Sequence, residues 1–140
     1  MNNSFFRSSF SVVFFLIFST VLYSQNNYSN SQIKNFVEEV FCDESNNLVF
    51  NNDERYKTIK RFISNIDIQL RVDIDVNKKF DNYLDLPLNN KYNPILQRDI
   101  IYSSTSSFNP LKYNAPMFPS KQKIYRLGNT QYLLFINPLN

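Results

Sequence analysis

The segment from Ile66 to Val76 places the strongest constraint on the fold, because apolar and polar residues alternate along it without interruption. The apolar set is Ile66, Ile68, Leu70, Val72, Ile74 and Val76, and the polar set between them is Asp67, Gln69, Arg71, Asp73 and Asp75. Successive side chains of a strand point to opposite faces of a sheet. The pattern therefore predicts a strand with one buried and one solvated face, which is typical of an antiparallel sheet covered on one side.

Two amphipathic helices are predicted before this strand. The first begins near Ser31, and its apolar positions recur at helical spacing: Ile33, Phe36, Val37, Val40 and Phe41. The second begins after a cap at Asn52 or Asp53, and its apolar stripe consists of Tyr56, Ile59, Phe62 and Ile63. Lys34 and Glu38 have the spacing of an ion pair on the solvent side. Helices with one apolar face are the natural cover for such a sheet.

The remaining strands are predicted in short segments. Leu48–Phe50 and Arg98–Tyr102 are strand candidates, and the chain closes with a hairpin in which residues 122–127 and 130–136 flank Gly128-Asn129. A two-residue type II′ turn at this Gly would place Tyr125 opposite Tyr132 and Ile124 opposite Leu133. The expected fold class is α+β, with two N-terminal helices packed on a small, mainly antiparallel sheet that ends in a β-hairpin.

The first part of the chain has the three regions of a secretory signal peptide. Arg7 precedes an apolar run from Phe10 to Tyr23, and Ser24 is a small residue at the cleavage position. Residues 1–24 are therefore predicted to be a cleaved signal, residues 25–30 a flexible tail and residues 31–140 a single domain. The alternative is a membrane anchor formed by residues 5–23, whose length approaches what a bilayer requires. The expected location is periplasmic or secreted, or the cell envelope if the segment is retained.

The composition excludes several kinds of chemistry. The chain has no His, one Gly and one Cys, so His-based catalysis, glycine-rich phosphate loops and cysteine metal clusters cannot be built. The lone Cys42 is expected to be a small, half-buried side chain. A net charge of +3 is too small to indicate a nucleic-acid partner, so the helix face with Lys57, Lys60 and Arg61 is interpreted as solvated. We expect no cofactor and no metal site.

Carboxylates offer the remaining route to catalysis. The segment Asp73-Ile-Asp-Val-Asn77 begins like a calcium-binding loop but departs from it at both diagnostic positions. Asp67, Asp73 and Asp75 share one face of the predicted strand, at a spacing that a two-carboxylate hydrolase could use. Arg71 on the same face supplies an ordinary ion-pair partner. The preferred interpretation is a non-enzymatic protein, and a carboxylate-dependent hydrolase is the alternative.

Two proline-containing loops carry the expected binding residues. The segments Lys91-Tyr-Asn-Pro94 and Lys112-Tyr-Asn-Ala-Pro116 are similar in sequence. Long loops on a rigid sheet often bind partners. Tyr combines an apolar ring with a hydroxyl, so Tyr92, Tyr102 and Tyr113 are the candidate binding residues. The competing interpretation is that the Asn-Pro pairs simply form turns and that the similarity of the two segments is coincidental. The binding hypothesis fails if the three rings are all buried in the core.

Three segments resemble stretches of small exported proteins from flavobacteria-like Bacteroidota. They are Asn90–Pro94, Phe108–Tyr113 and the hairpin segment Tyr125–Tyr132. The resemblance implies a location outside the cytoplasm and no particular activity or site. The combined expectation is an exported, non-enzymatic binding or structural protein. Its ligand or protein partner is unspecified, and it touches the membrane only through its signal peptide.

Overall fold

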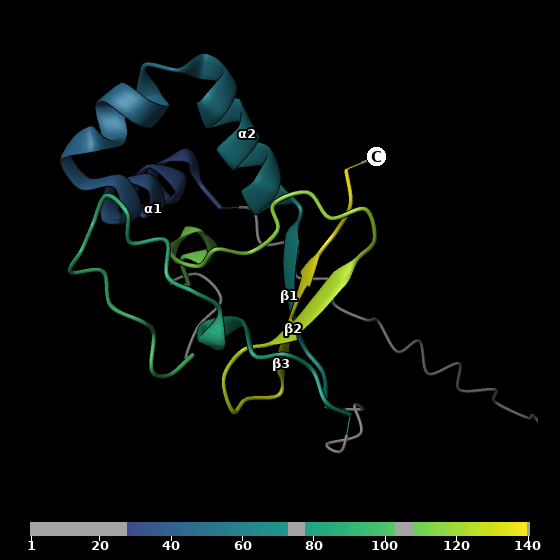
Figure 1. Ribbon diagram of the computed structural model, residues 1–140. Helices are drawn as coiled ribbons and strands as arrows, with labels where there is room; N and C mark the ends of the chain where they lie inside the picture. Colours follow the sequence, from purple (N-terminus) through teal and green to yellow (C-terminus); the bar gives the residue numbers. More distant parts are fainter. Residues whose placement is uncertain (1–27, 73–77, 103–107, 140) are drawn as a thin grey trace, which may run out of the picture.

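The computed structural model describes residues 28–72, 78–102 and 108–139 (Figure 1). In chain order the elements are α1 (Asn30–Phe41), η1 (Cys42–Glu44), η2 (Asn46–Phe50), α2 (Asp53–Ser64), β1 (Ile66–Leu70), η3 (Tyr83–Asp85), η5 (Pro110–Lys112), β2 (Lys123–Arg126) and β3 (Tyr132–Ile136). Helices combine with a three-stranded antiparallel sheet that ends in the β2–β3 hairpin. The expected α+β class is confirmed.

Several predictions concern residues that the structure does not describe. The signal segment 1–24, the alternative anchor 5–23, and Asp73 and Asp75 all lie outside the described ranges. Within those ranges, no helix combines the length and the apolar character needed to cross a membrane.

Helix α1 begins one residue earlier than predicted. The Ser29 side chain accepts a hydrogen bond from the backbone of Gln32, whose side chain accepts one from the Ser29 backbone, so the two residues form a capping box. The ring of Tyr28 also packs edge-on against Phe36, with centroids 5.3 Å apart. Residues 28–30 therefore belong to the start of the folded domain and not to a tail. The predicted ion pair between Lys34 and Glu38 is present at 3.6 Å.

The connection between the helices is helical, so the strand predicted at Leu48–Phe50 is wrong. A 3₁₀ turn, η1, and a short π-helix, η2, carry the chain from α1 to α2. Asn51 donates its backbone N–H to the carbonyl of Asn46 at 2.9 Å, which satisfies this segment locally without a partner strand. Cys42 ends α1 with a positive φ of 46° and is exposed, contrary to the half-buried position expected.

The sheet has the order β1-β3-β2, with β3 in the centre. On the face toward the main core, Ile66 and Ile68 of β1 lie beside Ile136 and Leu134 of β3, and all four are buried. The strand predicted to reach Val76 ends at Leu70, because its partner β3 begins at Tyr132, directly opposite. At Leu70 and Val72 the alternation no longer describes burial, since these side chains are 53% and 72% exposed.

The hairpin is present, but its loop is longer than predicted. Tyr125 pairs with Leu134 and Ile124 with Phe135, so the register differs by two residues from the expected one. Thr130 explains the longer loop, because its hydroxyl donates to the carbonyl of Leu127 at 2.7 Å and accepts from the N–H of Tyr132 at 3.1 Å. Residues 128–131 form the loop.

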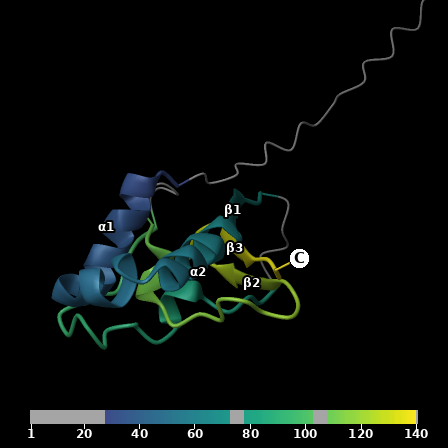
Figure 2. The same ribbon diagram turned by 90° about the horizontal axis from the view of Figure 1, so that it is seen from above.

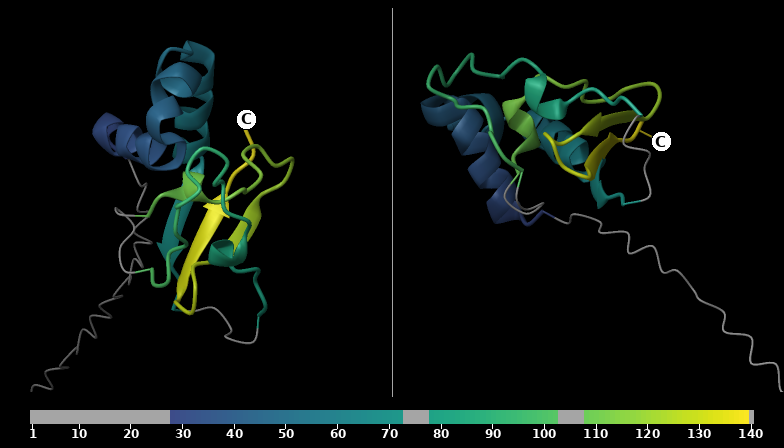
Figure 3. Two further views of the ribbon diagram at one scale, coloured as in Figure 1. Left: turned by 60° about the vertical axis from the view of Figure 1, so that its left-hand side comes forward. Right: turned by 90° about the horizontal axis from the view of Figure 1, so that it is seen from below.

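An aromatic cluster joins the helices to the sheet. The ring of Tyr83 contacts Phe108, Tyr113 and Tyr125, with centroids 5.2–5.7 Å apart, and its hydroxyl donates to the carbonyl of Pro110 at 3.0 Å. The turn η5, which carries Pro110, lies against α1 (Figures 1 and 2). Figure 3 shows the two helices grouped beside one end of the sheet, with these loop segments around the junction. Residues 98–102 belong to this loop system and do not form the predicted strand.

Candidate ligand-binding pocket

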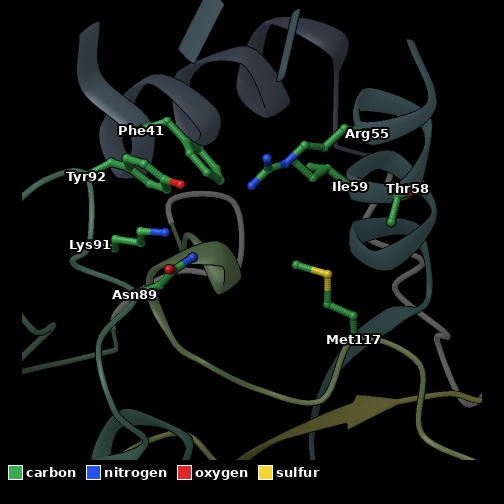
Figure 4. Close-up of a pocket in the computed structure, with 8 residues that line it drawn as sticks. All are labelled: Phe41, Arg55, Thr58, Ile59, Asn89, Lys91, Tyr92 and Met117. Atoms are coloured by element: carbon green, nitrogen blue, oxygen red, sulfur yellow. The ribbon is translucent and has the colours of Figure 1, made fainter. Parts of the chain in front are cut away.

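A partly open cavity of about 350 Å³ lies between α1, α2 and two loop segments. Its lining residues are Phe41, Arg55, Thr58, Ile59, Asn89, Lys91, Tyr92 and Met117 (Figure 4). The volume is at the lower end of the range found for small-molecule sites. Residues up to 76 positions apart in sequence, from Phe41 to Met117, meet around this space.

The two helices supply one half of the pocket. Phe41 is the last residue of α1 and closes its apolar stripe. Arg55 and Ile59 are one helical turn apart on α2, so they project from the same side of that helix. The backbone N–H of Arg55 donates to the cap residue Asn52 at 3.0 Å, which fixes the first turn of α2 and hence the root of the Arg55 side chain.

The loop that supplies the other half is held by hydrogen bonds to the folded body. Asn89 donates its backbone N–H to the carbonyl of Lys112 at 2.7 Å, and its side chain donates to the carbonyl of Leu111 at 3.4 Å. At the far end of the loop, Asn93 donates its side-chain amide to the carbonyl of Glu39 at 2.7 Å. The residues between these anchors include Lys91 and Tyr92. The pocket wall is therefore fixed to both η5 and α1.

Cations and aromatic rings alternate around the cavity. The rings of Phe41 and Tyr92 are adjacent, with centroids 5.6 Å apart. The guanidinium of Arg55 lies 5.4 Å from the Phe41 centroid, and the ammonium of Lys91 lies 5.1 Å from the Tyr92 centroid. These distances are within the range of cation–π attraction, so each ring helps to position one cation. Figure 4 shows the two cationic groups pointing into the cavity from opposite sides.

Among the residues that the structure describes, no carboxylate pairs with the cations of this pocket. None of its described lining residues is acidic. The ion pairs found between described residues involve Lys34, Lys57 and Lys112, and neither Arg55 nor Lys91 takes part in one. Lys57, two residues further along α2, shows the contrast, since it pairs with Glu54 at 3.0 Å. Two cations that have no ion-pair partner among the described residues therefore face one open cavity.

The three tyrosines predicted as binding residues have different environments. Tyr92 lies in the pocket wall, but Tyr102 and Tyr113 are buried in the core, with 6% and 3% of their surfaces exposed. The binding role predicted for those two residues is corrected, because neither ring can reach a partner while the core is closed. Of the two similar segments, one therefore places Tyr92 at a pocket and the other places Tyr113 in the interior. Their similarity does not mark a duplicated recognition loop.

A second polar cluster surrounds Lys112, and it is internally satisfied. The buried ammonium of Lys112 lies 2.7 Å from Asp99 and 3.5 Å from Glu39. Asn109 donates to Glu39 at 2.8 Å and to the carbonyl of Phe36 at 3.0 Å, and Tyr113 donates to Asp99 at 2.8 Å. Because the charges and hydrogen bonds are matched within the cluster, its role is to join η5 and the 98–102 loop to α1.

The alternative catalytic site has less support among the described residues. Of its three carboxylates only Asp67 is described, and it is half-buried and accepts a hydrogen bond from Gln69. Its face of the sheet is not the solvated surface predicted, since Phe135 and Leu133 on that face of β3 are buried. The described part of the chain contains no group of three or more metal-binding side chains.

Sequence reasoning missed most of the pocket. It identified Tyr92 and placed Phe41 and Ile59 on helix stripes, but it gave no role to Arg55, Asn89 or Met117. The only available signal was the Lys91-Tyr92 pair in a loop predicted to be long. Comparisons with family models, curated proteins and solved structures found no match to this chain.

Proposed function

We propose that the protein is an exported, non-enzymatic binding protein and that its ligand site is the pocket between Phe41, Arg55, Tyr92 and Met117. The observation that carries the proposal is the convergence of two unneutralised cations and an apolar wall on one partly open cavity. Small-molecule sites combine such an apolar lining with a few polar groups that fix orientation. Binding requires no catalytic group, which agrees with the lack of His and of glycine-rich loops in the sequence.

The pocket contains a convenient reporter for binding. The sequence has two methionines: Met117 lines the cavity, and Met1 belongs to the segment that the proposed export removes. The mature protein, labelled with ¹³C at its methionine methyl group, gives one methionine signal, and the loss of this signal in the conservative variant Met117→Leu assigns it. A mixture of small charged and neutral amphipathic compounds is then titrated into the wild-type protein. We expect several compounds to shift the Met117 signal. If no compound of any charge moves the Met117 signal, the pocket is not a ligand site.

The location is tested separately. Export is supported by the apolar run of residues 10–23 after Arg7 and by the resemblance to exported Bacteroidota proteins. The intact mass of the native protein is measured in soluble extracytoplasmic material and in washed membranes. A soluble species beginning at Gln25 is expected. A full-length species confined to membranes would replace this proposal with the signal-anchored envelope protein.

A further inference from the structure

We infer that the pocket binds a small amphipathic carboxylate, meaning a single carboxylate group attached to an apolar body. This inference rests on the proposed function and specifies the ligand class of the same site. It is carried by the polarity, charge, shape and size of the cavity.

The polar groups around the cavity are mainly hydrogen-bond donors. Arg and Lys side chains donate and cannot accept, and a Tyr hydroxyl can donate. Figure 4 shows the charged ends of Arg55 and Lys91 and the hydroxyl of Tyr92 directed toward the same space. A ligand that matches them must present acceptor atoms. Because no lining carboxylate offsets the two positive charges, an anionic acceptor fits better than a neutral one.

Apolar side chains also line the cavity. Ile59 and Met117 lie on the side away from Lys91, where Arg55 also enters, and Phe41 borders the space from above in Figure 4. A strongly hydrated anion such as phosphate would leave these groups in contact with water. A ligand with an apolar body would cover them, and burial of apolar surface on both partners favours binding. Met also adapts to ligands of irregular shape, because its side chain is unbranched and flexible.

The volume limits the size of the ligand. A water molecule occupies about 30 Å³ in the liquid, so a cavity of about 350 Å³ has room for roughly a dozen waters. This corresponds to a ligand of about a dozen non-hydrogen atoms, such as an aromatic propionate or a medium-chain fatty acid. A complete phospholipid or a folded protein segment is too large for the cavity.

The test compares ligands that differ only in charge or in apolar body. The Met117 methyl signal is followed while 3-phenylpropionate, its neutral amide 3-phenylpropanamide, acetate and inorganic phosphate are added separately to the mature protein. We expect 3-phenylpropionate to bind at least fivefold more tightly than the amide, because only the acid supplies the charge that Arg55 and Lys91 attract. Acetate and phosphate are expected to bind at least fivefold more weakly than the acid, because they lack the apolar body.

Matched variants locate the interaction. Arg55→Gln and Lys91→Gln each remove one cation from the pocket, and each is expected to weaken binding of the acid about fivefold to tenfold. Arg61→Gln removes the same charge from the exposed last turn of α2 and is expected to leave binding unchanged. The helix cap does not confound Arg55→Gln, because the bond to Asn52 uses the backbone of residue 55. Circular dichroism of each variant checks that the fold is retained.

The outcomes separate this inference from the proposal on which it rests. Equal binding of the acid and the amide overturns the anionic ligand class, although the pocket remains a binding site. Binding of acetate or phosphate as tight as that of the acid overturns the requirement for an apolar body. A loss in Arg61→Gln equal to that in Arg55→Gln shows attraction by net charge and overturns the assigned contacts. If no compound shifts the Met117 signal, the proposal that the pocket is a ligand site is refuted as well.

Discussion

Buried tyrosines make the stability of this protein sensitive to alkaline pH. Burial raises the pKa of Tyr28 to about 12. Burial also raises the pKa values of Tyr83 and Tyr113 far above their usual range, with a smaller contribution at Tyr83 from neighbouring tyrosines. The pKa of Tyr125 is raised in the same direction by burial and by Asp81. In the unfolded chain all four phenols titrate near pH 10.

The sign of the effect follows from proton binding in the two states. Above pH 10 the unfolded chain releases these phenolic protons while the folded protein keeps them, so the unfolded state gains stability as pH rises. At about pH 11, one unit above the unfolded pKa, each phenol that stays protonated in the folded state lowers the free energy of unfolding by about 1.4 kcal/mol. Tyr28, Tyr83 and Tyr113 together give a loss of about 4 kcal/mol, a large part of the stability of a typical domain. This contribution is fully present below pH 10 and is lost above it.

The assay is urea unfolding followed by circular dichroism at about pH 8 and about pH 11. Tyr83→Phe removes one of the phenols, so the alkaline loss should be smaller by about 1.4 kcal/mol than in the wild type. The same variant should be less stable at about pH 8 by roughly 1–2 kcal/mol, because the carbonyl of Pro110 loses its buried donor. Val49→Ala is the control, since it lowers stability by about 2 kcal/mol at a fully buried site without removing a titratable group. Equal alkaline losses in Tyr83→Phe and in the wild type would refute the linkage argument.

Substitutions at three further positions test the fold itself by urea unfolding at neutral pH. Lys112→Ala should lower the free energy of unfolding by about 2–3 kcal/mol. The loss is smaller than for a fully buried ion pair, because Asp99 and Glu39 are partly exposed to solvent. Lys112→Met should lower it less, since methionine keeps an apolar side chain of similar length. If neither variant changed the stability, the cluster would not hold η5 and the 98–102 loop to α1. Asn52→Ala should cost about 1 kcal/mol through loss of the α2 cap, and no change would show that water replaces it. Gly128→Ala should cost roughly 1–2 kcal/mol, because φ is +60° and the new Cβ would lie 3.3 Å from a Leu84 methyl; a stabilised variant would contradict this.

The elements that sequence predicted well are those determined by local pattern. The two helices follow from their apolar stripes and from caps at Ser29 and Asn52, all of which act within a few residues. The strand beginning at Ile66 follows from alternation in the same way. Its end could not be predicted, because it depends on where β3 begins, and that strand is distant in sequence. The hairpin register failed for a different reason: the Thr130 hydroxyl stabilises a longer loop that the Gly-Asn pair alone does not indicate.

The pocket could not be predicted from the sequence for a similar physical reason. Its two cations come from a helix and from a loop without regular structure, and the hydrogen bonds of Asn89 and Asn93 bring that loop to the helix. Nothing in the residues near Lys91 shows which surface the loop will meet. The burial of Tyr113 is equally a property of the assembled core, since its ring partner Tyr83 comes from a distant segment of the chain.

The position of β3 in the middle of the sheet has a consequence for how the chain acquires its structure during synthesis. β1 and β2 are both made before β3, yet neither pairs with the other, and each finds its partner only in residues 132–136. A ribosome that has produced residues 1–126 has therefore made two strands with unsatisfied backbone edges and no sheet. Assembly of the sheet is therefore delayed until its latest strand emerges.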